Sequence, residues 1–187
     1  MLTRYCMNVL CATVSEAIDH AGGLICDRAL TGWDVGVFAL DGDAAAEYDL
    51  ALRILGAGRV GSMSPEPAEQ PLLRAVVVSG DTYRTNPELR RWVEAAMDEP
   101  RIEVLLWDTG RQAPDGRYVE IPVSRAAAGF LDHARAAADH DATSRTSEFY
   151  RQLRTGRIRQ SLRRHTVLTT VNGGSGGVHR GFLLGFA

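Results

Sequence analysis

The chain has 187 residues and a formal net charge of −2, and 45% of its residues are hydrophobic and 24% charged, which is typical of one globular domain with an appendage. No apolar run approaches the roughly 20 residues that a transmembrane helix needs, and the N-terminal stretch passes directly into a helical pattern, so we expect a cytoplasmic protein without a signal peptide or membrane partner. All 21 basic residues are arginine, and the absence of lysine excludes Schiff-base, phosphate-loop and lysine-base chemistry.

The first element that the sequence predicts is a helix. Apolar residues recur at helical spacing between Ser15, a candidate N-cap, and Gly32, a candidate stop. Gly22 and Gly23 weaken a helix at its middle and therefore indicate a kink or close packing against another element. The face expected to be buried contains Val14, Ala17, Ile18, Ala21, Leu24, Ile25 and Ala29.

The next segments predict strands and a loop. Residues 33–40 are rich in strand-forming residues, and residues 74–80 form the short apolar run of a strand that is covered on both faces. Residues 46–55 fit either a short helix or a second strand. Residues 56–71 have the Gly, Ser and Pro content of a surface loop.

The clearest helix follows the valine-rich strand. Asn86 can cap it, Pro87 fits its first position and Pro100 ends it. Residues 101–108 then predict another buried strand. A strand, a helix and a strand of these lengths form a βαβ unit, so we expect the two strands to be parallel, with a right-handed crossover.

The last predicted elements of the main domain are a strand and a helix. Residues 117–123 fit a strand, in which Pro122 indicates an edge position. Residues 124–140 fit a helix whose inward face is expected to contain Ala127, Phe130, Leu131, Ala134 and Ala138. Residues 1–141 are therefore expected to form a three-layer, Rossmann-like α/β sandwich with a mainly parallel sheet.

The remaining residues, 142–187, differ sharply in charge from the rest. Residues 1–141 have 13 Arg and 22 acidic residues, a net charge of −9, whereas 142–187 have 8 Arg and one acidic residue, a net charge of +7. We expect a basic tail with a helix over 146–165 and then a Gly-rich arm or hairpin. Its candidate binding residues are Arg151, Arg154, Arg157, Arg159, Arg163 and Arg164.

Carboxylates follow three of the predicted strands at the points where the strands end: Asp41, Asp43, Asp81 and Asp108. Ligands of open parallel sheets bind at the carboxyl ends of the strands, and carboxylates that converge there can hold Mg²⁺. These four residues are the catalytic candidates, and Asp41 and Asp81 are the candidate metal ligands. The structural alternative is that Asp81 only shapes a turn, where Gly80 permits tight geometry.

The motifs "VFALDGD" and "VVVSGD" resemble the metal-binding strand ends of the NYN branch of the PIN-like nucleases. Members of that family cut RNA with Mg²⁺ or Mn²⁺ held by carboxylates on a Rossmann-like sheet. The resemblance implies a metal role for Asp41 and Asp81, and extends it to Asp43. Ala44 and Tyr83 depart from the motifs of the family.

Other catalytic arrangements find less support in the sequence. No serine stands in a G-x-S-x-G elbow, and His133 and His140 fall on the polar face of a helix, so no serine-centred triad is predicted. The three cysteines are expected to be reduced and packed, because their spacing with His20 does not match a zinc knuckle.

Two functions are therefore expected, in order. The first is a non-catalytic binding or regulatory protein without a cofactor, whose Arg-rich tail contacts nucleic acid or an acidic protein surface. The alternative is a Mg-dependent NYN/PIN-like nuclease or phosphoesterase with carboxylates at the strand ends. A tail that docks on a twin subunit would also produce a homo-oligomer.

Overall fold

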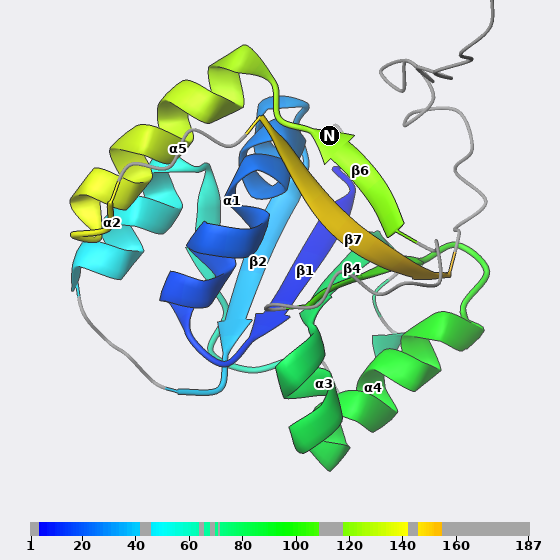
Figure 1. Cartoon of the computed structure of the whole chain (residues 1–187). Helices are drawn as coiled ribbons and strands as arrows, with labels where there is room; N and C mark the ends of the chain where they lie inside the picture. The colour runs from blue at the N-terminus through cyan, green and yellow to red at the C-terminus, as the bar shows by residue number, and fades with distance from the viewer. Residues whose placement is uncertain are drawn as a thin grey trace, which may run out of the picture.

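The computed structural model describes residues 4–41, 46–63, 66–67, 70, 72–108, 118–141 and 146–154. They form a mixed α/β fold around a seven-stranded sheet with the order β3-β2-β1-β4-β5-β7-β6 (Figure 1). The strands are β1 (Cys6–Cys11), β2 (Asp34–Ala39), β3 (Ala57–Arg59), β4 (Leu73–Ser79), β5 (Glu103–Trp107), β6 (Tyr118–Pro122) and β7 (Ser147–Arg154).

The sheet is mainly parallel, as the sequence predicts. β1 lies at its centre between β2 and β4, and all pairings from β3 to β5 are parallel. Only β7 runs antiparallel, and it pairs with β5 on one side and β6 on the other. The ends of β1, β2, β4 and β5 therefore meet at one edge of the sheet, which we call the carboxyl edge.

Helices cover both faces of the sheet (Figure 1). One face packs against α1, α2 and α5, and its core includes Ile18, Leu52 and Leu131. The other packs against α4, whose Leu89 and Val93 lie in a core cluster with residues of β4 and β5. The helices are α1 (Val14–Leu30), α2 (Ala46–Ile54), α3 (Gly80–Thr85), α4 (Pro87–Asp98) and α5 (Arg125–Ala137).

Several local predictions are confirmed. The Asn86 side chain accepts hydrogen bonds from the amides of Glu88 and Leu89, so it caps α4 as expected. The ambiguous residues 46–55 form a helix, α2. Helix α1 is also present, although its cap is Thr13 rather than Ser15, because the Thr13 hydroxyl accepts from the amide of Glu16.

Two predictions made from local pattern are wrong, and the pattern misses one strand. β1 has no counterpart among the predicted strands, although it is the central strand of the sheet. The loop predicted over 56–71 contains the short strand β3. Phe130 lies outward with 43% of its surface exposed, because Leu131 occupies the inward position at that turn of α5.

The prediction of a helix over 146–165 is wrong for its first residues, because Ser147–Arg154 form the strand β7. Glu148 and Tyr150 are both buried, with an exposed residue between them, which is the period of a strand and not of a helix. β7 pairs with β5 and β6, and these pairings determine its conformation. Residues 155–187 of the predicted tail lie outside the described residues.

Helix α1 is opened at its middle by groups from other elements. The Glu148 carboxylate accepts hydrogen bonds from the amides of Gly23 (2.7 Å) and Leu24 (2.9 Å). In a regular helix these amides would donate to the carbonyls of residues 19 and 20. The carbonyl of Asp19 instead accepts from the Arg135 guanidinium at 3.3 Å. The Tyr150 hydroxyl, which donates to Glu148 at 2.6 Å, lies 3.2 Å from the carbonyl of His20.

The glycine pair in α1 has the close packing that the sequence predicts. A Cβ atom on Gly22 would lie 2.5 Å from a methyl group of Leu131, and one on Gly23 would lie 2.5 Å from Val123. The cysteines are free, as expected. Within the described part of the chain, no helix is long and apolar enough to cross a bilayer.

Candidate active site

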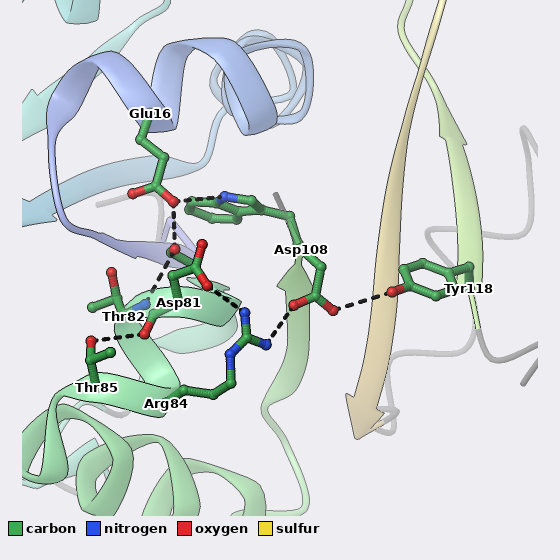
Figure 2. A network of polar contacts seen from close by, with 9 residues as sticks. Glu16, Asp81, Thr82, Arg84, Thr85, Asp108 and Tyr118 are labelled. Carbon is green, nitrogen blue, oxygen red and sulfur yellow. Dashed lines mark hydrogen bonds and ion pairs between the residues drawn. The ribbon is translucent and has the colours of Figure 1, made fainter. Parts of the chain in front are cut away.

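Glu16 ties together the ends of three strands at the carboxyl edge (Figure 2). It follows β1 and accepts hydrogen bonds from the Ser79 hydroxyl at the end of β4 and from the Trp107 indole N–H (3.2 Å) at the end of β5. Its second oxygen accepts from the amide of Ala12 at 3.1 Å. Because both oxygens are already bound, Glu16 organises this edge and is a poor candidate for a general base.

Arg84 lies between two of the predicted catalytic carboxylates (Figure 2). Its guanidinium donates to Asp108 at 2.7 Å and also to Asp81. These hydrogen bonds, first to Asp108 and then to Asp81, raise the pKa of Arg84. The Tyr118 hydroxyl donates to the other oxygen of Asp108 at 3.2 Å. Asp81 and Asp108 thus come together, but through a cation that occupies the space between them.

The other predicted site residues take no part in these hydrogen bonds or lie outside the described residues. Asp41 follows β2, and its amide donates to the carbonyl of Ala12 at 2.9 Å. Arg151 and Arg154 lie on β7. The residues outside the described part of the chain are Asp43, Arg157, Arg159, Arg163 and Arg164.

The described residues contain no group of three or more His, Cys, Asp or Glu side chains that could hold a metal ion. The carboxylates that do converge at the carboxyl edge have hydrogen bonds to Arg84, Tyr118, Ser79 and Trp107 instead. Burial and the nearby Glu16 raise the pKa of the Cys11 thiol, so the cysteine at this edge is held in its protonated form.

A serine, a histidine and an aspartate lie in series beside Glu16. The Ser15 hydroxyl is 3.0 Å from His140 Nε2, and His140 Nδ1 is 3.4 Å from Asp19 Oδ1. Ser15 and Asp19 are one turn apart on α1, so they present their side chains to the same side. The imidazole is largely covered, with 18% of its side chain exposed.

The C-terminus of α5 determines where His140 lies. The amide of His140 donates to the carbonyl of Arg135 (2.9 Å), and the amide of Asp139 donates to that of Ala136 (3.3 Å). This is a Schellman motif, and Asp139 occupies its left-handed position with a φ of +55°. A non-glycine residue there is uncommon and costs free energy, which is more often tolerated near functional sites.

Sequence reasoning missed this trio. His140 lies just beyond α5 and turns back on α1, whereas the helical pattern predicts that it faces solvent. The local pattern favours Ser15 as the N-cap, but Thr13 takes that role. A local signal was available in "TVSE", where Thr13 and Glu16 have the spacing of a capping box and would have placed Ser15 inside the first turn.

Comparison with known proteins gives a fold but not a family. No family model matches the chain, and no curated protein matches it significantly. A solved structure of a deacetylase from the biosynthesis pathway of teicoplanin, in complex with teicoplanin, is similar with a TM-score of 0.55. It is 12% identical, and the match covers 79% of this chain and 97% of that chain.

Two further structures have TM-scores of 0.50. One is GalB, the 4-carboxy-2-hydroxymuconate hydratase from Pseudomonas putida KT2440, which is 13% identical over 84% of this chain and 99% of its own. The other is the N,N'-diacetylchitobiose deacetylase from Pyrococcus horikoshii, which is 12% identical over 79% of this chain and 83% of its own. At these identities the likeness concerns the fold.

These findings correct the function expected from the sequence. The solved structures that share the fold have the names of enzymes, two deacetylases and a hydratase, and this overturns the expectation of a non-catalytic binding or regulatory protein. None of the three is named as a nuclease or phosphoesterase. The cluster of Asp81 and Asp108 around Arg84 also differs from the open carboxylate site that the alternative requires.

Proposed function

We propose that this protein is a hydrolase of an acyl bond, an ester or an amide. Ser15 is the nucleophile, His140 the general base, and Asp19 the residue that orients His140. The observation that carries the proposal is the series Ser15 Oγ, His140 Nε2, His140 Nδ1 and Asp19 Oδ1, with separations of 3.0 Å and 3.4 Å. A triad is recognised by such geometry and roles rather than by sequence position.

The place of the trio in the sheet supports the proposal. The order β3-β2-β1-β4-β5, with helices on both faces, supports a resemblance to doubly wound sheets. In such sheets ligands bind outside the carboxyl ends where the strand order reverses, which here is between β1 and β4. Ser15 follows β1 at this point, and its neighbour Glu16 is bound to Ser79 at the end of β4.

The chemistry of acyl transfer fits these three side chains. Ser15 Oγ attacks the carbonyl carbon while its proton passes to His140 Nε2. The tetrahedral intermediate collapses, the bond to the alcohol or amine breaks, and His140 returns the proton to that leaving group. Water then attacks the acyl-serine while His140 accepts a proton from the water. The bond to Ser15 Oγ breaks, His140 returns that proton to Ser15 Oγ, and the acid is released.

Helix α1 supplies a site for the developing negative charge. The first amides of a helix have no partner within it, and the helix dipole favours an anion there. Val14 and Ser15 are the first two residues of α1, so their N–H groups lie at the carboxyl edge beside the nucleophile. Two of the solved structures that share the fold are named as deacetylases, and removal of an acetyl group is one reaction of the proposed class.

A fluorophosphonate tests the proposal without knowledge of the substrate. An activated serine displaces fluoride from phosphorus and forms a stable adduct, which peptide mass spectrometry can locate. We expect labelling at Ser15, none in Ser15→Ala, and labelling at least about a hundredfold slower in His140→Gln, since general-base catalysis is worth about 10²–10⁴. Ser62→Ala, which removes an exposed hydroxyl after β3, is the matched control. An unlabelled Ser15 in the wild-type protein would overturn the proposal.

A further inference from the structure

We propose that Arg135 is a positioning residue of this site, which fixes Asp19 and through it the orientation of His140. The effect of Arg135 on catalysis rests on the proposed function, whereas its effect on the orientation of His140 is tested separately. Arg135 acts on this site through Asp19, so its role is indirect.

Arg135 contacts Asp19 at two points. Its Nη2 atom donates to the backbone carbonyl of Asp19 (3.3 Å), and its Nε atom lies 3.5 Å from the Asp19 carboxylate. The planar guanidinium thus contacts the backbone of Asp19 through a hydrogen bond and its side chain through an ion pair. The carboxylate is 40% exposed, whereas the arginine side chain is 1% exposed, so the buried partner sets the position of the exposed one.

The opening of α1 makes this contact available. In a regular helix the carbonyl of Asp19 would accept from the amide of Gly23, but that amide donates to Glu148. Arg135 takes the place of that donor at the carbonyl of Asp19. Openings of this kind within helices are frequent at functional sites. Here the opening lies one turn from Ser15 and next to the residue that orients the base.

The same arginine is also linked to the histidine through the backbone. The carbonyl of Arg135 accepts the amide of His140 in the Schellman motif at the end of α5. The side chain of Arg135 therefore holds one partner of the Asp19–His140 pair, while its carbonyl holds the other. One buried residue determines the distance between the two, which is the quantity that a relay of hydrogen bonds depends on.

The test compares Arg135→Met with Arg28→Met, because Arg28 is a second buried arginine on the same helix layer, paired with Glu103 at 3.8 Å. Two quantities are measured in each folded variant: the rate of fluorophosphonate labelling at Ser15, and the ¹⁵N chemical shifts of the His140 ring, which report its tautomer. We expect Arg135→Met to slow labelling about a hundredfold and to shift His140 from the Nδ1–H tautomer to a mixture. Arg28→Met should leave both quantities as in the wild-type protein.

A second variant covers the case in which Arg135→Met does not fold. Arg135→Lys keeps the charge, but an ammonium cannot hold both Asp19 atoms as a fork does, so we expect an intermediate rate and a partial change of tautomer. Unchanged tautomer and labelling rate in the folded variants would overturn the inference. If the wild-type protein is not labelled at all, the proposed function fails, and the His140 tautomer alone still decides whether Arg135 positions the pair.

Discussion

Removal of the Glu148 carboxylate should destabilise the protein, because it leaves two buried amides without an acceptor. Glu148 is 3% exposed and accepts from the amides of Gly23 and Leu24 and from the Tyr150 hydroxyl. A buried donor without a partner costs about 1–3 kcal/mol, so two of them cost about 2–6 kcal/mol. Closure of the opened turn in α1 would re-pair the amides in part, and we therefore expect about 2–4 kcal/mol for Glu148→Ala.

Urea unfolding measures this loss. With a slope of about 1–3 kcal/mol per molar urea, the midpoint should fall by roughly 1 M or more. Glu148→Gln keeps one acceptor but places an NH₂ group against one amide, so its loss should be smaller, about 1–3 kcal/mol. Glu120→Ala on β6 removes an exposed carboxylate and should stay within about 0.5 kcal/mol of the wild-type protein. A Glu148→Ala midpoint equal to that of Glu120→Ala would refute the role given to Glu148.

Two further predictions concern glycines in two different helices and a buried acidic residue. Gly129→Ala on α5 should stabilise the protein by about 0.5–1 kcal/mol, because a Cβ there would meet no atom within 4 Å. Gly23→Ala should destabilise it by about 1–3 kcal/mol, because a Cβ there would lie 2.5 Å from Val123. Thermal or urea unfolding in which the two variants have the opposite order of stability would contradict this. Burial raises the pKa of Glu103 above its usual 4.5, against the opposing effect of Arg28. The folded protein therefore holds this proton more tightly than the unfolded chain does. As the pH rises through the folded pKa, ionisation of Glu103 lowers the free energy of unfolding. The stability of Glu103→Gln relative to the wild-type protein should therefore increase between pH 4 and pH 7, and a constant difference in urea unfolding would count against it.

Local patterns determined those elements whose signals lie within a few residues. The cap at Asn86, the stop at Gly32 and the apolar stripe of α4 follow from hydrogen-bond capacity and helical periodicity, and the structure reproduces them. The valine-rich run of β4 also follows, because a strand covered on both faces has no polar positions. Even the close packing at Gly22 and Gly23 could be inferred, since glycine in a helix requires a compensating contact.

Pairing across the sheet decided what the local patterns left open. The six residues of β1 have no alternation and lead directly into α1, so only their partners β2 and β4 make them a strand. The residues of β7 have charges compatible with a helix, and the edge offered by β5 and β6 determines their conformation instead. A strand depends on hydrogen bonds to other segments, which no single stretch of sequence contains.

The candidate site shows the same division. The sequence by itself determined that this is an α/β protein without lysine chemistry, and that polar residues gather where its parallel strands end. Only the tertiary structure brought His140 to Ser15 across 125 residues, placed Arg84 between Asp81 and Asp108, and joined Glu148 to the opened turn of α1. These contacts depend on the register of the strands and on the direction in which α5 ends, and both are set by packing between segments that are remote in the chain.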